Sequence, residues 1–239
     1  MPPKVRLFWA PWSHYCVCAE LQLAHKGVNA ELVTVPYHDK TRLIAETGQD
    51  YVPALDWGGR IVPWKEIPTF LEDQVPEPSL FPFDMTGVAT ILERWGHQVL
   101  EEKVWSTVVT KVAPTFRDER ERWVFEEIQR RVRGPLERFE TLHDEFLEEL
   151  EPELAWIDTA LDGRDWLLGE PSLADWGVYG GLSPIRLVGE NVPDHFEHLP
   201  GWIGRVEEIR RRANAARSGA PASAPAKPGK STSGRGRKG

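Results

Sequence analysis

The sequence predicts a small α/β domain with a mixed sheet, followed by an all-helical bundle. Over residues 1–80, short apolar segments rich in β-branched residues alternate with helical segments. A segment with two prolines, residues 77–83, then interrupts the chain. Beyond it, apolar residues recur three and four positions apart, and no further strand pattern follows. We therefore expect a first domain at residues 1–80 and a helical domain at residues 81–212.

The first strand and helix of the chain are well marked. Residues 5–9 are apolar and rich in β-forming residues, so they predict a strand. After a break at residues 10–12, the pattern becomes helical at Ser13, and Lys26-Gly27 supplies a typical helix end. The free N–H groups and the positive dipole end at Ser13 favour an anion, such as a thiolate or carboxylate. A plain N-cap role explains the same serine equally simply.

The rest of the first domain contains three further strand segments, one of them at residues 51–55, and two helices. Residues 30–35 predict a strand, residues 39–47 a short helix, and the two glycines at residues 57–60 a hairpin into a strand at residues 60–62. A helix carrying Ile67, Phe70 and Leu71 ends before Pro76.

Pro53 interrupts the apolar segment at residues 51–55. Proline is normally confined to the edge or the start of a strand. A cis Val52–Pro53 bond would resolve the conflict and turn the Val52 backbone outward.

The helical domain should contain several amphipathic helices. The apolar spacing predicts them at residues 86–112, 120–133, 136–161, 172–188 and 202–212, with a kink or a division of the third at Pro152. Ser172 and Asp175 form a capping-box pattern, which we interpret as structural.

Composition limits the possible functions. The two cysteines, Cys16 and Cys18, are two residues apart in a predicted helix and cannot bridge each other there, so we expect a reducing, cytoplasmic environment. No apolar segment approaches the roughly 20 residues of a membrane helix. The N-terminus also lacks the apolar core of a signal peptide.

The net charge is −8, yet residues 213–239 carry six basic residues and no acid. We expect this Pro-, Ala-, Gly- and Ser-rich tail to be disordered, a solubilising extension or one that makes weak contact with nucleic acid or anionic lipid. The acidic remainder argues against a nucleic-acid enzyme.

Taken together, these features resemble the glutathione transferase superfamily. The resemblance rests on Ser13 and Cys16 as an SxxC at a helix start, on Val52-Pro53, on the proline-rich linker, and on residues 165–175 (DWLLGEPSLAD), which are similar to that family's "fLxGxxxSxAD" signature. It implies a thioredoxin-like domain followed by a helical domain, and a homodimer. It also implies glutathione as co-substrate and a small hydrophobic electrophile as partner.

The resemblance assigns roles to individual residues. Ser13 would be the catalytic residue that hydrogen-bonds the glutathione sulfur, and Val52, before Pro53, would pair its backbone with the peptide. The electrophile would lie between the domains, against Trp12, Tyr15 and Trp105.

One departure from the family affects the γ-glutamyl end of the peptide. Pro63 and Trp64 stand where the family has an acidic residue followed by serine, so Trp64 and Lys65 are the residues left to contact that end.

Other interpretations stay open. Pro63-Trp64 favours a non-catalytic protein of this fold that binds hydrophobic ligands or protein partners. A glutathione-dependent thiol reductase acting through Cys16 is a third hypothesis, although Ser13 replaces the leading cysteine of a CxxC. Residues 104–109 faintly resemble bacterial β-etherases, which would make the reaction an ether cleavage. The seven histidines show no metal-ligand spacing, so no metal is expected.

Overall fold

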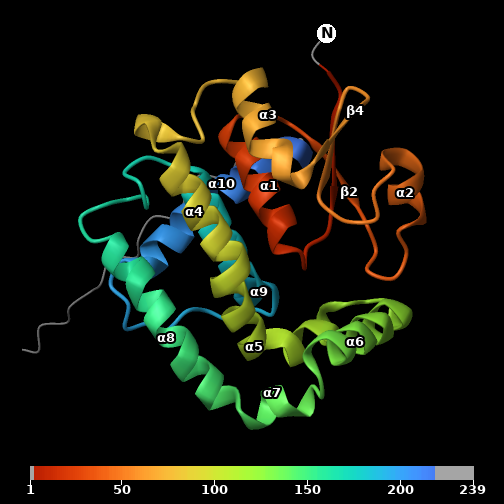
Figure 1. The fold of residues 1–239 in the computed structure, drawn as a ribbon, viewed down its shortest axis with the longest axis vertical. Helices are drawn as coiled ribbons and strands as arrows, with labels where there is room; N and C mark the ends of the chain where they lie inside the picture. The colour runs from red at the N-terminus through yellow and green to blue at the C-terminus, as the bar shows by residue number, and fades with distance from the viewer. Residues whose placement is uncertain (1–2, 219–239) are drawn as a thin grey trace, which may run out of the picture.

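The computed structural model describes residues 3–218, which form the predicted α/β domain and the predicted helical domain (Figure 1). Of the expected basic tail, residues 219–239 lie outside the described residues. Within the described part of the chain, no helix is both long and apolar enough to cross a bilayer.

The first domain contains a four-stranded mixed sheet in the order β2-β1-β3-β4. Strand β1 runs parallel to β2 and antiparallel to β3, and β4 pairs antiparallel with β3. The register places Leu7 opposite Leu32 on one side and Leu55 on the other. The elements in chain order are β1 (Val5–Trp9), α1 (His14–His25), β2 (Glu31–Thr34), α2 (Thr41–Thr47), β3 (Ala54–Trp57), β4 (Arg60–Pro63) and α3 (Ile67–Gln74).

Local sequence explains the turns around these elements. Gly58 and Gly59 both have positive φ, which a two-residue hairpin turn between β3 and β4 requires. Gly27 also has positive φ and follows Lys26, the C-cap of α1. The Val52–Pro53 bond is cis, as the sequence predicted, and β3 begins only after it.

The helical domain follows a proline-containing linker. Its elements are α4 (Thr86–Trp95), the π-helical turn η3 (Gly96–Leu100), α5 (Glu101–Val112), α6 (Glu119–Arg133), α7 (Glu137–Thr141), α8 (His143–Ala160), α9 (Leu173–Leu187) and α10 (Leu199–Ser218). The long helix predicted at residues 86–112 is therefore continuous, with a π-helical turn inside it. Pro152 does not divide the helix that contains it; the division lies at Leu142, whose backbone leaves the helical region.

Helix α9 is the central helix of the molecule. It packs against α1 from the first domain and against α4, η3 and α5 from the second (Figure 1). Its start is fixed by Asp175, a buried carboxylate that accepts hydrogen bonds from the Ser172 N–H (3.0 Å), the Ser172 hydroxyl (2.8 Å), the Leu167 N–H (3.0 Å) and the Trp202 indole (2.9 Å). The structural interpretation of this capping pattern is confirmed.

The boundary of the predicted tail needs correction, because α10 continues to Ser218 rather than ending before residue 213. The reason is an ion-pair cluster that joins this helix to α1. Glu20 is 1% exposed and pairs with Arg210 (2.9 Å) and with Arg217. A buried carboxylate needs such partners, so the end of α10 is held against the first domain.

The contact between α9 and η3 allows a direct test of the fold. A Cβ atom at Gly181 would lie 2.3 Å from the Gly96 carbonyl oxygen, which is backbone and cannot swing away. We expect Gly181→Ala to lower the free energy of unfolding by about 2 kcal/mol or more. The measurement is urea denaturation followed by circular dichroism.

Gly204→Ala is the matched control, because Gly204 lies in α10, is exposed, and has no atom within 4 Å of the position that a Cβ would take. It should stabilise the protein by roughly 0.5–1 kcal/mol. Equal effects of the two substitutions would contradict the close packing of α9 on η3.

Candidate functional site

A pocket of about 280 Å³ lies between the two domains at the N-terminus of α1. It brings together five residues that the sequence singled out: Trp12, Ser13, Tyr15, Val52 and Trp105. Further side chains line it from the loop after β2 and from α5 and α6, namely Tyr37, Lys40, Glu101, Phe125, Gln129 and Arg133. Both domains therefore contribute to one site.

Ser13 is both the N-cap of α1 and a lining residue of this pocket. Its Oγ accepts a hydrogen bond from the Cys16 N–H (3.4 Å), and the residue is 7% exposed. Because a hydroxyl also has a hydrogen that rotates freely, Ser13 can cap the helix and still donate to a ligand atom. The two interpretations of Ser13 from the sequence are compatible.

The other predicted thiol-binding residues differ in their positions. Val52 lines the pocket, whereas Pro53, behind it, is buried and does not. Trp64 and Lys65 are also outside the lining. The Trp64 ring packs on Tyr15, with ring centroids 4.3 Å apart, and the Lys65 ammonium lies 5.4 Å from the centroid of the Trp64 ring. Trp64 therefore supports Tyr15. A direct contact of Trp64 or Lys65 with the γ-glutamyl end of a bound thiol compound stays a prediction.

The charged groups of the pocket were not predicted from the sequence. Arg133 is held by Glu102 (2.7 Å) and lies over the Trp105 ring at 5.7 Å. Lys40 adds a second cation from the loop between β2 and α2. Periodicity places Arg133 on a charged helix, but it does not indicate that α6 faces the first domain. In the structure, the Tyr37 N–H of the first domain donates a hydrogen bond to Glu121 of α6 (2.6 Å).

His14 and Tyr15 form the part of the pocket next to Ser13. His14 is not solvent-facing, because its Nδ1 lies 3.2 Å from a Glu101 oxygen and its side chain is 14% exposed. Burial raises the pKa of Tyr15, and the nearby carboxylates of Glu101 and Glu93 raise it further. Tyr15 therefore stays a neutral phenol near pH 7.

Cys16 is fully buried and does not line the pocket. Burial raises the pKa of its thiol to about 12, against the opposing hydrogen bonds of Ser13 and of the Ala10 backbone. A thiolate is the reactive form of cysteine in redox chemistry. The structure thus gives the thiol reductase hypothesis no accessible thiolate at Cys16.

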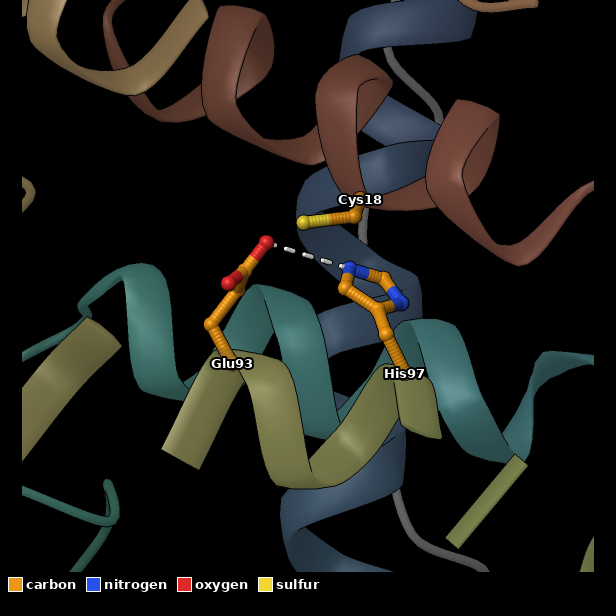
Figure 2. A group of neighbouring side chains, drawn as sticks. All are labelled: Cys18, Glu93 and His97. Atoms are coloured by element: carbon orange, nitrogen blue, oxygen red, sulfur yellow. Dashed lines mark ion pairs between the residues drawn. The ribbon is translucent and has the colours of Figure 1, made fainter. Parts of the chain in front are cut away.

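Three side chains that could hold a metal ion meet in the interior, and the histidine spacing in the sequence did not indicate this group. Cys18 from α1, Glu93 from α4 and His97 from η3 are all buried, and their ligand atoms lie within 4.8 Å of one another (Figure 2). The sequence contains one indication of this group: Glu93 and His97 are four residues apart and so share one helix face. The partner from α1 could not be seen from spacing.

Known proteins resemble this chain in structure rather than in sequence. No protein-family model matches the sequence, and no curated protein matches it. Among solved structures, a glutathione transferase from Phanerochaete chrysosporium is similar, with a TM-score of 0.75, 15% identity, and coverage of 87% of this chain and 98% of that one. Glutaredoxin 2 from Salmonella typhimurium, in complex with glutathione, has a TM-score of 0.72, 16% identity, and coverage of 87% and 95%.

A β-etherase from Sphingobium sp. strain SYK-6 is similar as well, with a TM-score of 0.63, 19% identity, and coverage of 89% of this chain and 99% of that one. All three likenesses span both domains, because each covers most of both chains. The described part of the chain therefore has the glutathione transferase fold, a thioredoxin-like domain followed by a helical domain.

Proposed function

We propose that this protein activates a thiol, glutathione by preference, for nucleophilic attack on a small hydrophobic electrophile. The observation that carries the proposal is the position of Ser13, which starts α1 and lines the pocket between the domains. A glutathione complex among the structures of similar fold supports glutathione as the thiol.

The chemistry follows from the electrostatics at the start of α1. The first N–H groups of a helix have no partner within the helix, and the helix dipole places partial positive charge there. A sulfur beside Ser13 would also accept a hydrogen bond from the Ser13 hydroxyl. Both effects stabilise the thiolate over the thiol, so the thiol proton passes to solvent. The sulfur electron pair then forms the C–S bond, while the leaving group departs with the pair of the broken bond.

The pocket also suits the rest of glutathione, which carries two carboxylates. Lys40 and Arg133 supply positive charge at the wall of the pocket. Val52 is a further lining residue, and its backbone can pair with the cysteinyl backbone of the peptide as an added strand would.

The electrophile would occupy the aromatic part of the pocket, formed by Trp12, Trp105 and Phe125. Trp12 packs edge-on against Tyr37, with centroids 4.6 Å apart, so this wall is braced by a second ring. The similar fold of a β-etherase supports an aryl ether as one electrophile to test. A homodimer and a cytoplasmic location remain predictions from the sequence.

A non-catalytic binding protein is the second candidate, and Pro63-Trp64 favours it. Neither side chain offers an acceptor to an ammonium group, and the Trp64 ring is already occupied by Tyr15 and Lys65. Such a protein would keep the aromatic pocket but would not bind the γ-glutamyl end of glutathione.

Substitutions at Ser13 separate catalysis from helix capping. We expect Ser13→Ala to lower kcat/KM for conjugation of a chlorodinitrobenzene to glutathione roughly 10- to 100-fold, because the donor to the thiolate is lost. Ser13→Thr keeps the hydroxyl and should retain most of the activity. Ser13→Asp keeps a capping oxygen but places a carboxylate beside the sulfur, so it should be as impaired as Ser13→Ala.

Ser106→Ala serves as the control, because Ser106 lies on α5 and outside the pocket lining. Full activity of Ser13→Asp would mean that Ser13 acts only as a cap. A wild-type protein that neither conjugates nor binds glutathione would instead support the second candidate; thermal shift at millimolar glutathione provides that binding measurement.

The buried cysteines give a test of the reductase hypothesis. Burial raises the pKa of both thiols, so neither should react with an aromatic disulfide reagent in the native protein at pH 8. Both should react once the protein is unfolded in guanidinium, and Cys16→Ser should conjugate as well as wild type. A native thiol that reacts quickly and disappears in Cys16→Ser would revive the reductase hypothesis.

A further inference from the structure

We propose that Cys18, Glu93 and His97 form a zinc site at the joint between the two domains. The sulfur comes from α1 of the first domain, and the carboxylate and imidazole come from α4 and η3 of the second. Figure 2 shows the three side chains pointing toward one another from facing helices. This site is separate from the thiol-binding pocket and goes beyond the proposed function.

The spacing of the ligand atoms suits a small divalent ion. The three atoms lie within 4.8 Å of one another, and His97 Nε2 is 3.5 Å from Glu93 Oε1. Ligands bound at 2.0–2.3 Å to a tetrahedral zinc stand ~3.3–3.8 Å apart. The His97–Glu93 distance lies within this range, and rotation of the side chains would bring the wider spacings of the cluster, which reach 4.8 Å, onto one ion.

The second observation is that His97 is buried without hydrogen-bond partners. It is 4% exposed, and neither ring nitrogen finds a hydrogen-bond partner among the described residues. Buried polar groups in proteins are almost always paired, because an unpaired one costs free energy. An ion bound by Nε2 supplies a partner for that nitrogen and also compensates the buried Glu93 carboxylate beside it.

Helix α9 covers the proposed site, and two of its glycines, Gly177 and Gly180, lie against the ligand residues. A Cβ at Gly177 would lie 2.5 Å from Glu93 Cα, and a Cβ at Gly180 would lie 3.2 Å from His97 Cε1 and 3.4 Å from Cys18 Cβ. The backbone of α9 can approach all three ligands because these two positions have no side chain. The cluster is therefore walled off from solvent, which strengthens ion–ligand interactions.

Gln22 provides a fourth donor on the same face of α1 as Cys18. Its Nε2 lies 3.3 Å from Cys18 Sγ, whereas its Oε1 is buried and finds no partner among the described residues. The oxygen and nitrogen of an amide side chain are assigned by their surroundings. Turned over, Gln22 places Oε1 beside the sulfur, which makes it the candidate for a fourth ligand.

This donor set selects zinc among the common metals. Thiolate and imidazole suit zinc, whereas calcium and magnesium require oxygen ligands. His97 also packs on Tyr15 and His14, with ring centroids 4.3 and 4.9 Å apart, and both of these residues line the thiol-binding pocket. The ion would thus lie one layer beneath the pocket and tie α1 to α4.

The test uses the full chain, purified without a histidine tag, stripped with chelator and then titrated with Zn²⁺ or Co²⁺. We expect one equivalent of zinc per chain after gel filtration and a thiolate-to-cobalt charge-transfer band in the near ultraviolet. Cys18→Ser should lose the band and bind zinc at least tenfold more weakly, and His97→Gln should also bind more weakly. Zinc should raise the Tm of the wild type by several degrees and leave that of Cys18→Ser unchanged.

Cys16→Ser is the matched control, since Cys16 is the other buried cysteine of α1 and lies outside the cluster. It should keep the band, the stoichiometry and the rise in Tm. Circular dichroism of the stripped variants checks that each is folded, and Glu93→Gln replaces any variant that is not. Wild-type protein that retains no zinc, or zinc and cobalt signals that survive in Cys18→Ser and His97→Gln, would overturn the proposal.

Discussion

The packing of α1 against α9, over a core that it shares with the sheet, is the constraint on which the site depends. Most of this helix is buried, and the glycines of α9 allow a close approach from the second domain. The end of α10 adds a further tie, through the ion pairs of Arg210 and Arg217 with Glu20. Because α1 is fixed in this way, its N-terminus and Ser13 have a defined direction, which is into the pocket between the domains. The partial positive charge of that helix end therefore faces the pocket.

The same packing creates a second, deeper layer. Tyr15 and His14 line the pocket on one side and contact His97 on the other. The thiol would be activated in the pocket, where Ser13 and the cations lie. The proposed ion would hold α1 against α4 in the cluster that contains His97. The two proposals rest on different residues, so either can fail without affecting the other.

Much of the fold followed from patterns that lie close together in the chain. The strand, turn and helix at the N-terminus, the cis bond at Pro53 and the capping box at Asp175 are local, and the structure has them all. The clearest failures involve distant contacts. Nothing near Arg217 indicates that it pairs with Glu20, so composition alone predicts a tail where α10 in fact continues. Likewise, Cys18 meets Glu93 only through the packing of two domains.

The central claim is that the start of α1 binds the sulfur of glutathione as a thiolate. The most direct measurement is a pH titration of thiolate ultraviolet absorbance for glutathione bound to the wild-type protein, taken as the difference from the ligand-free protein, in which the two buried protein thiols cancel. An ordinary cysteine thiol has a pKa of about 8.5. We expect the pKa of the glutathione thiol to be lower by about one unit or more in the complex. A bound thiol that titrates at or above the value of free glutathione would contradict it.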